Sequence, residues 1–173
     1  MTSSIRKLPD KHFEINLPVR DDAIFPSNRN QVFGNFLRTK KRLEKDRKYF
    51  DDYDAFMESM FERGFAERIP ENEISSDNEK WYIPHHAVYH KQKNKIRIVF
   101  NCAQKYQETS LNTNLLPGPD LTSSLLGVLL RFREENVAVM ADIQRMFYQI
   151  RIPKHQADLL RFFWFDETKS KIV

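Results

Sequence analysis

The stretch Val137-Ala-Val-Met-Ala-Asp-Ile-Gln-Arg-Met-Phe-Tyr-Gln-Ile150 is the part of the sequence on which the predicted fold depends. Its first five residues form a short apolar run that is rich in β-branched side chains, which predicts a buried strand over Val137–Ala141. Asp142 follows, at a position where a charge is costly unless a partner, a hydrogen bond or a metal compensates it. Asp is also a common helix N-cap. On this stretch alone, capping the next turn is the favoured role of Asp142.

Composition sets broad limits on the whole chain. The 173 residues are 40% hydrophobic and 30% charged, which suits one globular domain or a domain with an extension. The net charge of +4 and a pI near 9.1 are compatible with a nucleic-acid partner, but a solvated surface gives the same values. The single cysteine, Cys102, excludes an internal disulfide and a cysteine-based zinc site.

The sequence has no pattern of a secreted or membrane-spanning protein. Residues 1–10 lack the apolar core of a signal peptide. No run approaches the roughly 20 apolar residues that a membrane span needs. The prediction is therefore an intracellular chain, cytoplasmic or nuclear, without a membrane partner.

The first half of the chain predicts an extended segment followed by two helices. Residues 1–28 are polar and rich in proline, with one short strand where apolar and polar residues alternate over Phe13–Leu17. Residues 29–65 carry apolar side chains at spacings of three and four, which predicts a helical hairpin. Asp46 is placed to cap its second helix, and Gly64 to end that helix in the left-handed conformation.

Two charged or polar features follow from the same region. The first helix carries a basic run, Arg38-Thr-Lys-Lys-Arg42, for which a solvated face is favoured over a nucleic-acid contact. Residues 66–80 are polar and predict a linker, which gives the best domain boundary in the chain.

Residues 81–100 predict a β-hairpin with a cationic turn, Lys91-Gln-Lys-Asn-Lys95, between two β-rich runs. Strand alternation places Arg97 on one face with Val99, and Ile98 on the other. The adjacent His85 and His86 could suggest a metal site, but two neighbouring histidines have poor ligand geometry. We do not predict a metal there.

The second half predicts a helix and several strands. A helix over Leu121–Arg133 has an apolar inner side and precedes the strand that ends in Asp142. A strand over Ile150–Ile152 ends at Pro153, and one or two helical turns follow. Leu160–Phe165 predicts a further strand.

Several long motifs resemble a known family. They are Trp81-Tyr-Ile-Pro-His-His-Ala-Val, Lys95-Ile-Arg-Ile-Val-Phe-Asn-Cys-Ala, Ser110-Leu-Asn, Leu116-Pro-Gly-Pro-Asp-Leu-Thr-Ser-Ser-Leu-Leu-Gly-Val-Leu-Leu-Arg-Phe-Arg133 and Met140-Ala-Asp-Ile-Gln-Arg-Met-Phe-Tyr-Gln-Ile150. In this order they resemble the reverse transcriptase of BEL/Pao-type retrotransposons. The resemblance is close over residues 81–165 and looser over the predicted helices of residues 29–65.

The resemblance implies an α+β fold. Residues 81–173 would be the fingers and the partial palm of a right-hand polymerase, with a partial antiparallel sheet and a helix against it. The helices of residues 29–65 would be an N-terminal extension.

The same resemblance assigns roles to individual residues. Asp142 matches the first catalytic aspartate, which binds two magnesium ions, and Phe147 matches the aromatic under the sugar of the incoming nucleotide. Arg97 matches the arginine that meets the triphosphate, and a planar guanidinium suits that task. Lys95 or Lys93 would assist it as a point charge. Gln149 and Arg151 are the expected contacts to the template or primer.

One departure from the family decides the functional expectation. The family places an aromatic-x-Asp-Asp turn further along the palm, and this sequence has Asp-Asp pairs only at residues 21–22 and 51–52. One carboxylate cannot hold the two Mg²⁺ ions of phosphoryl transfer. We therefore expect a fragment of an RNA-directed DNA polymerase that does not extend primers alone. The alternatives are a non-catalytic nucleic-acid-binding or interaction protein derived from a retroelement, and a degenerate, partly folded product.

Overall fold

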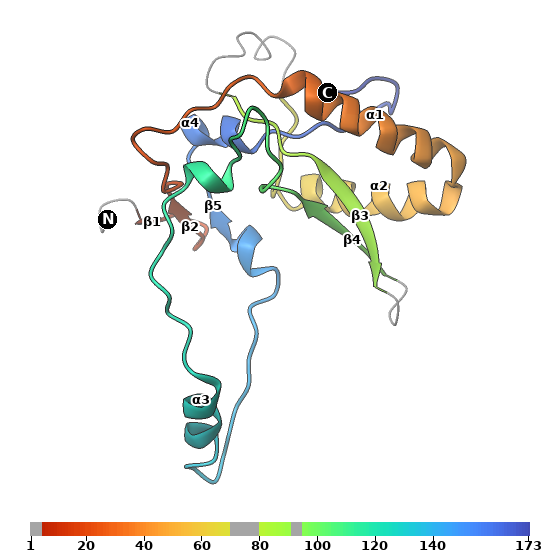
Figure 1. The fold of residues 1–173 in the computed structure, drawn as a ribbon. Helices are drawn as coiled ribbons and strands as arrows, with labels where there is room; N and C mark the ends of the chain where they lie inside the picture. The colour runs from red at the N-terminus through yellow and green to blue at the C-terminus, as the bar shows by residue number, and fades with distance from the viewer. Residues whose placement is uncertain (1–4, 70–79, 91–94) are drawn as a thin grey trace.

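The computed structural model describes residues 5–69, 80–90 and 95–173 (Figure 1). Its helices and strands alternate along the chain, and this mixed content agrees with the expected α+β class. The predicted linker of residues 66–80 lies largely outside the described residues, as does most of the turn at residues 91–95.

Two antiparallel helices, α1 (Arg29–Lys45) and α2 (Arg47–Glu62), form the predicted helical hairpin. The Asp46 side chain accepts a hydrogen bond from the backbone N–H of Tyr49 at 2.9 Å, which confirms the predicted cap of α2. Gly64 follows α2 with φ at 66°, a conformation that glycine adopts without the steric cost of a side chain.

The strands β3 (His85–His90) and β4 (Lys95–Phe100) form the predicted β-hairpin. They pair antiparallel over six residues each, from His85 opposite Phe100 to His90 opposite Lys95. Alternate residues are buried or partly buried, since Ile98 is in the core and Arg97 and Val99 are exposed. The predicted separation of Arg97 from Ile98 is confirmed.

An aromatic core joins the helices, the β-hairpin and the end of the chain. Trp164 is 1% exposed, and its ring stacks on Tyr53 of α2 with 5.0 Å between centroids. Phe36 of α1 packs edge-on against both Trp164 and Phe165. The buried members of this core are Val32, Phe36, Leu43, Tyr49, Tyr53, Met57, Tyr82, Ile98, Phe163, Trp164 and Phe165. Burial of this much aromatic surface fixes the β-hairpin against the two helices.

A second, smaller core lies beside a three-stranded sheet. The sheet has the order β1 (Ile5–Lys7), β2 (Phe13–Ile15) and β5 (Ile150–Arg151). The predicted strands at Phe13 and Ile150 therefore exist, but β5 runs parallel to β2 and not within an antiparallel palm sheet. Trp81, Ile83, Leu111 and Leu159 form the core itself.

The expected strand over Leu160–Phe165 is wrong. The segment follows two short helical turns, α4 (Lys154–Ala157) and η5 (Asp158–Leu160), and makes only isolated bridges at Arg161 and Phe165. The backbone of Arg161 bonds to Trp81 and Ile83, and the carbonyl oxygen of Phe163, the next acceptor in register, bonds to the side chain of His85. The segment is largely buried, so its apolar character reflects the core and not a strand.

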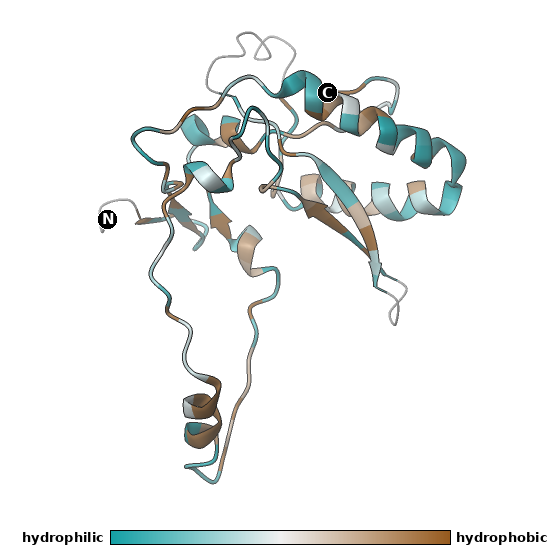
Figure 2. Ribbon diagram, in the orientation of Figure 1, coloured by the Kyte–Doolittle hydropathy of each residue, from teal (hydrophilic) through white to brown (hydrophobic). Residues whose placement is uncertain are grey.

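The region around Asp142 also differs from the prediction. Residues 117–145, here called the arm, leave the body and return to it, with α3 (Leu125–Phe132) at the far end (Figure 1). The helix is shorter than the expected Leu121–Arg133, and Figure 2 shows it as an apolar segment outside the body. From Pro117 to Gln144 every residue except Gly127 is exposed. The expected inner side of this helix therefore faces no sheet.

The predicted buried strand over Val137–Ala141 is wrong as well. The segment has no regular structure and is exposed, with Met140 at 85%. A strand needs a neighbour for its N–H and C=O groups, and neither described sheet includes residues 137–141. The apolar pattern gives strand propensity, but no partner strand lies beside it in the described part of the chain.

Candidate functional site

The outer face of the β3–β4 hairpin carries the residues that the sequence assigns to nucleotide binding. It consists of alternate residues that form three cross-strand pairs: His86 with Val99, Val88 with Arg97, and His90 with Lys95. Arg97 and Lys95 are both exposed. These six residues include no acid, so the face is cationic or neutral along its length. Lys93 lies outside the described residues.

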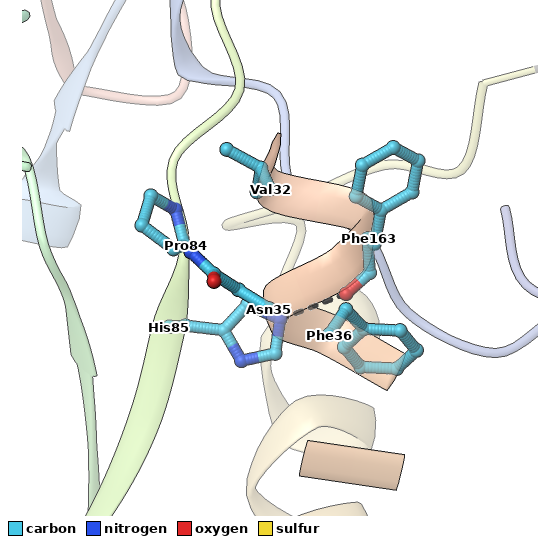
Figure 3. Close-up of a pocket in the computed structure, with 6 residues that line it drawn as sticks. All are labelled: Val32, Asn35, Phe36, Pro84, His85 and Phe163. Atoms are coloured by element: carbon cyan, nitrogen blue, oxygen red, sulfur yellow. Dashed lines mark hydrogen bonds between the residues drawn. The ribbon is translucent and has the colours of Figure 1, made fainter. Parts of the chain in front are cut away.

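A buried histidine fixes the start of this hairpin (Figure 3). His85 Nε2 lies 2.7 Å from the carbonyl oxygen of Phe163, which can only accept, so Nε2 carries the proton and donates it. Nδ1 is then an acceptor for the Tyr53 hydroxyl of α2. One imidazole thereby joins α2, β3 and the segment at Phe163.

Burial determines the charge of that imidazole. It lowers the pKa of His85 to about 4, because the charged form is poorly solvated in the core. Burial also raises the pKa of Tyr53, which keeps the hydroxyl protonated as a donor. Val32, Asn35, Phe36 and Pro84 complete the small pocket around this pair (Figure 3). His85 therefore serves the fold as a neutral hydrogen-bonding group and is unsuited to a metal.

A second contact holds the far end of β3 on α2. The Tyr89 hydroxyl donates to Asp52 at 3.0 Å, and Lys48 pairs with the same carboxylate at 2.7 Å. The hydrogen bond between Lys48 and Asp52 lowers the pKa of Asp52 and raises the pKa of Lys48. Both ends of β3 are thus attached to α2, and Arg97 is presented from a fixed strand pair.

Asp142, the expected catalytic residue, lies on the arm. It is exposed and belongs to no helix or strand. Figure 1 shows the part of the arm between α3 and β5 well separated from the β3–β4 hairpin. The structure therefore does not bring the Asp142 segment together with the hairpin outer face.

Phe147 follows in a short 3-10 helix, η4 (Met146–Gln149), and is 83% exposed. Arg145, the residue before η4, has φ at 54°, so the chain turns sharply there. Its neighbour Tyr148 stacks on Phe65 with 5.1 Å between centroids, which attaches η4 to the end of the helical hairpin. Phe147 itself is left free for a contact with a ligand or another surface.

The two expected template contacts are engaged within the chain. Gln149 donates to the carbonyl oxygen of Gln144 at 3.2 Å. Arg151 forms an ion pair with Asp10 at 2.7 Å. In the sheet, Arg151 lies opposite Glu14 of β2. Both side chains are bound locally, so the structure gives them no free orientation toward a nucleic acid.

The residues around Asp142 do not fit a magnesium site. Mg²⁺ requires a set of oxygen ligands in near-octahedral arrangement. Across residues 5–69, 80–90 and 95–173, no three His, Cys, Asp or Glu side chains gather as a metal site would need. One exposed carboxylate does not supply such a set. The same residues contain no helix that is long and apolar enough to cross a membrane.

Sequence reasoning missed the buried polar residues that organise the body. Asn28 binds the backbone of Tyr82 twice, donating to its carbonyl oxygen at 2.8 Å and accepting from its N–H at 2.9 Å. Nothing in the pattern around Asn28 signals this long-range pairing. His85 could have been found, because strand alternation places it on the same face as Ala87 and Tyr89, which is the core face.

Comparisons with protein-family models, with curated proteins and with solved structures found no match for this chain.

Proposed function

We propose that this chain is the fingers and the start of the palm of a BEL/Pao-type reverse transcriptase. In this proposal it binds the phosphates of a nucleotide and of a template–primer, and it does not extend a primer alone. The parent reaction is the template-directed addition of a deoxynucleotide to a primer 3′ end. The motifs of residues 81–165 are the basis of the proposal, and the hairpin outer face is the structural feature that supports it best.

The observation that carries the proposal is the placement of Arg97. Its side chain is exposed, a planar fork of donors on β4, and β4 pairs with the strand β3 that two contacts hold against α2. Lys95 is exposed on the same face, two residues away. A cationic pair on a rigid support, without an acid on that face, is suited to a polyphosphate.

Asp142 keeps its proposed role as the first metal-binding carboxylate only in the presence of further carboxylates. Mg²⁺ would be the cofactor of the complete enzyme, where it would stabilise the attacking and the leaving oxygens. No step of polymerisation is assigned to the residues of this chain. Phe147 is proposed to contact the sugar, since its ring is free.

The primary test is the binding of a fluorescent deoxynucleoside triphosphate, measured by anisotropy. Arg97→Ala is expected to weaken binding about tenfold or more, because charge-assisted hydrogen bonds are lost. Arg97→Lys keeps the charge but loses the fork, so it should restore only part of the affinity. Arg20→Ala is the matched control, since Arg20 is also exposed and lies far from the hairpin in sequence. Equal losses for Arg97→Ala and Arg20→Ala would refute a nucleotide site on the hairpin.

Primer extension with magnesium tests the absence of catalysis. We expect no incorporation by the chain above that of an Asp142→Asn variant. Incorporation that depends on Asp142 would show that one exposed carboxylate is enough, contrary to the proposal.

A second candidate is a non-catalytic nucleic-acid-binding protein derived from the same element. The exposed, isolated Asp142 favours it, because the chain then needs no metal site. It predicts duplex or single-strand binding with no measurable affinity for a free triphosphate. The Arg97→Lys variant separates the two, since a phosphate-backbone contact depends on charge more than on the fork.

A further inference from the structure

The positive charge of this chain is concentrated in one short segment. Residues 38–48 contain seven Lys or Arg and two Asp or Glu, a net charge of +5. The whole chain carries +4, so all other residues together carry −1. The basic balance of the protein is therefore a local property of the end of α1 and the start of α2.

Within this segment four cations share one face of α1. Arg38, Lys41, Arg42 and Lys45 follow the spacing i, i+3, i+4, i+7, which places them on a single stripe. We call these four residues the basic stripe. The apolar side of α1 lies opposite the stripe. Its buried residues, Val32, Phe36 and Leu43, face the core.

The basic stripe lacks the acidic partners that its neighbours have. Arg47 and Lys48, at the start of α2, pair with Asp51 and Asp52 at 3.0 and 2.7 Å. Lys40 pairs with Glu44 on the flank of α1 at 3.8 Å. For the four cations of the stripe, the described part of the chain offers no acid within ion-pair distance.

The contacts that the stripe does make leave its charge available. Arg38 donates to the side-chain oxygen of Asn35 at 3.3 Å. The Arg42 guanidinium lies over the Tyr49 ring, 4.2 Å from its centroid. Neither contact neutralises a cation. Arg38, Lys41, Arg42 and Lys45 are all exposed, and the Tyr49 ring holds Arg42 in place.

A solvated helix face does not account for this pattern. Cations in the last turn complement the helix dipole, but that effect falls off within one turn and covers only Arg42 and Lys45. Arg38 with Arg42, and Lys41 with Lys45, are like-charge pairs at i, i+4, and each pair destabilises the helix. The stripe weakens the helix that carries it, which indicates an external polyanion.

We infer that the basic stripe is a docking surface for the phosphate backbone of a nucleic acid, separate from the hairpin outer face. Its seven-residue span covers about 10 Å along α1, which matches about three successive phosphates of one strand of a duplex. An anionic membrane is the less suitable partner, because an amphipathic helix binds a membrane through its apolar face. In α1 that face is buried in the aromatic core.

The test is the salt dependence of binding to a fluorescent 20-base-pair duplex, measured with the full chain by anisotropy between 50 and 200 mM KCl. The variant Arg38→Gln/Lys41→Gln/Lys45→Gln leaves the Arg42–Tyr49 contact intact. We expect its slope of log affinity against log salt to be shallower by about 2 to 3, because three phosphate contacts are lost. Thermal unfolding should show that the variant is as stable as the original chain or slightly more stable.

The matched control removes the same charge elsewhere. Arg20→Gln/Arg133→Gln/Lys154→Gln neutralises three exposed cations outside the stripe. An equal change of slope in both triple variants would show that the effect depends only on the net charge of the chain, and this would overturn the inference. So would an unchanged slope in the stripe variant, binding to phosphatidylserine vesicles in place of the duplex, or equal competition by poly-glutamate.

The inference and the proposed polymerase role can fail separately. The stripe variant should leave triphosphate binding unchanged, because the hairpin outer face is intact. Arg97→Ala should alter the duplex slope by about 1 at most. Loss of triphosphate binding with an intact stripe effect would remove the proposed function alone.

Discussion

The β3–β4 hairpin and the arm are both rich in apolar residues, yet the hairpin is partly buried and the arm is exposed. The hairpin buries one face on α2 and is attached by His85 and Tyr89 to the same helix. The arm buries almost none of its apolar side chains, and those of α3 are all exposed. Apolar content alone therefore does not make a segment part of a core. A matching surface must also be present, and the arm has none among the described residues.

The largest expected difference between the two regions is in the cost of removing an apolar side chain. Trp164→Ala leaves a cavity beside Tyr53 in the core that holds the hairpin and should cost about 3–5 kcal/mol. Leu129→Ala in α3 should change the free energy of unfolding by less than about 0.5 kcal/mol. Urea unfolding followed by circular dichroism measures both. Similar costs for the two variants would show that the arm packs against the body.

Local pattern predicted the hairpin well and the arm poorly, for a physical reason. The alternation of Ile96, Arg97 and Ile98 specifies a strand with one buried face, and the partner strand is next to it in sequence. The run Val137–Ala141 specifies strand propensity only, and a strand also needs a neighbour that its own residues do not encode. The same limit explains why Asp142 was expected at the end of a buried strand and lies on an exposed segment.

Helical spacing was similarly informative where the contacts are local. The two helices, the Asp46 cap and the Gly64 terminus follow from residues within a few positions of one another. The joints made by Asn28 and His85 connect residues 54 and 78 positions apart. No spacing rule reaches that far, so the partners of Asn28 and His85 could not be assigned from the sequence, although strand alternation places His85 on the core face.

The next effect in size concerns the buried imidazole at the start of the hairpin. Its folded pKa is about 4, against an ordinary value of 6.5. Between those values the unfolded chain binds a proton that the folded chain does not, so stability falls as the pH drops from 6.5 to 4. The shift corresponds to about 3 kcal/mol. Below pH 4 both states are protonated at this residue and its contribution is constant.

The measurement compares urea unfolding of the original chain and of His85→Gln at several pH values. Glutamine does not titrate, so the stability gap between the two proteins should narrow by about 3 kcal/mol as the pH falls from 7 to 4. His86→Gln changes the exposed neighbour and keeps the buried imidazole, so its stability should still fall between pH 7 and 4. A constant gap for His85→Gln would mean that the imidazole is not buried in its neutral form.

A smaller effect is expected at the second attachment of the hairpin. Tyr89→Phe removes the hydroxyl that donates to Asp52 and should cost about 1 kcal/mol, since Lys48 still pairs with that carboxylate. A double-mutant cycle with Asp52→Ala isolates the pair. A coupling energy near zero would show that this contact does not hold β3 on α2.

The smallest effect on stability, and the clearest on association, is expected in the arm. Leu126→Glu/Leu130→Glu places charges on α3, where both side chains are already exposed, so the free energy of unfolding should change by less than about 0.5 kcal/mol. Exposed apolar patches of this kind favour association, and analytical ultracentrifugation should show less self-association for the variant. Ile98→Glu, on the buried face of the hairpin, is the contrasting control and should unfold the chain, because it leaves an unpaired charge in the core. If the α3 variant unfolded as Ile98→Glu does, the arm would have a partner within the chain, and the contrast between the two regions would not hold.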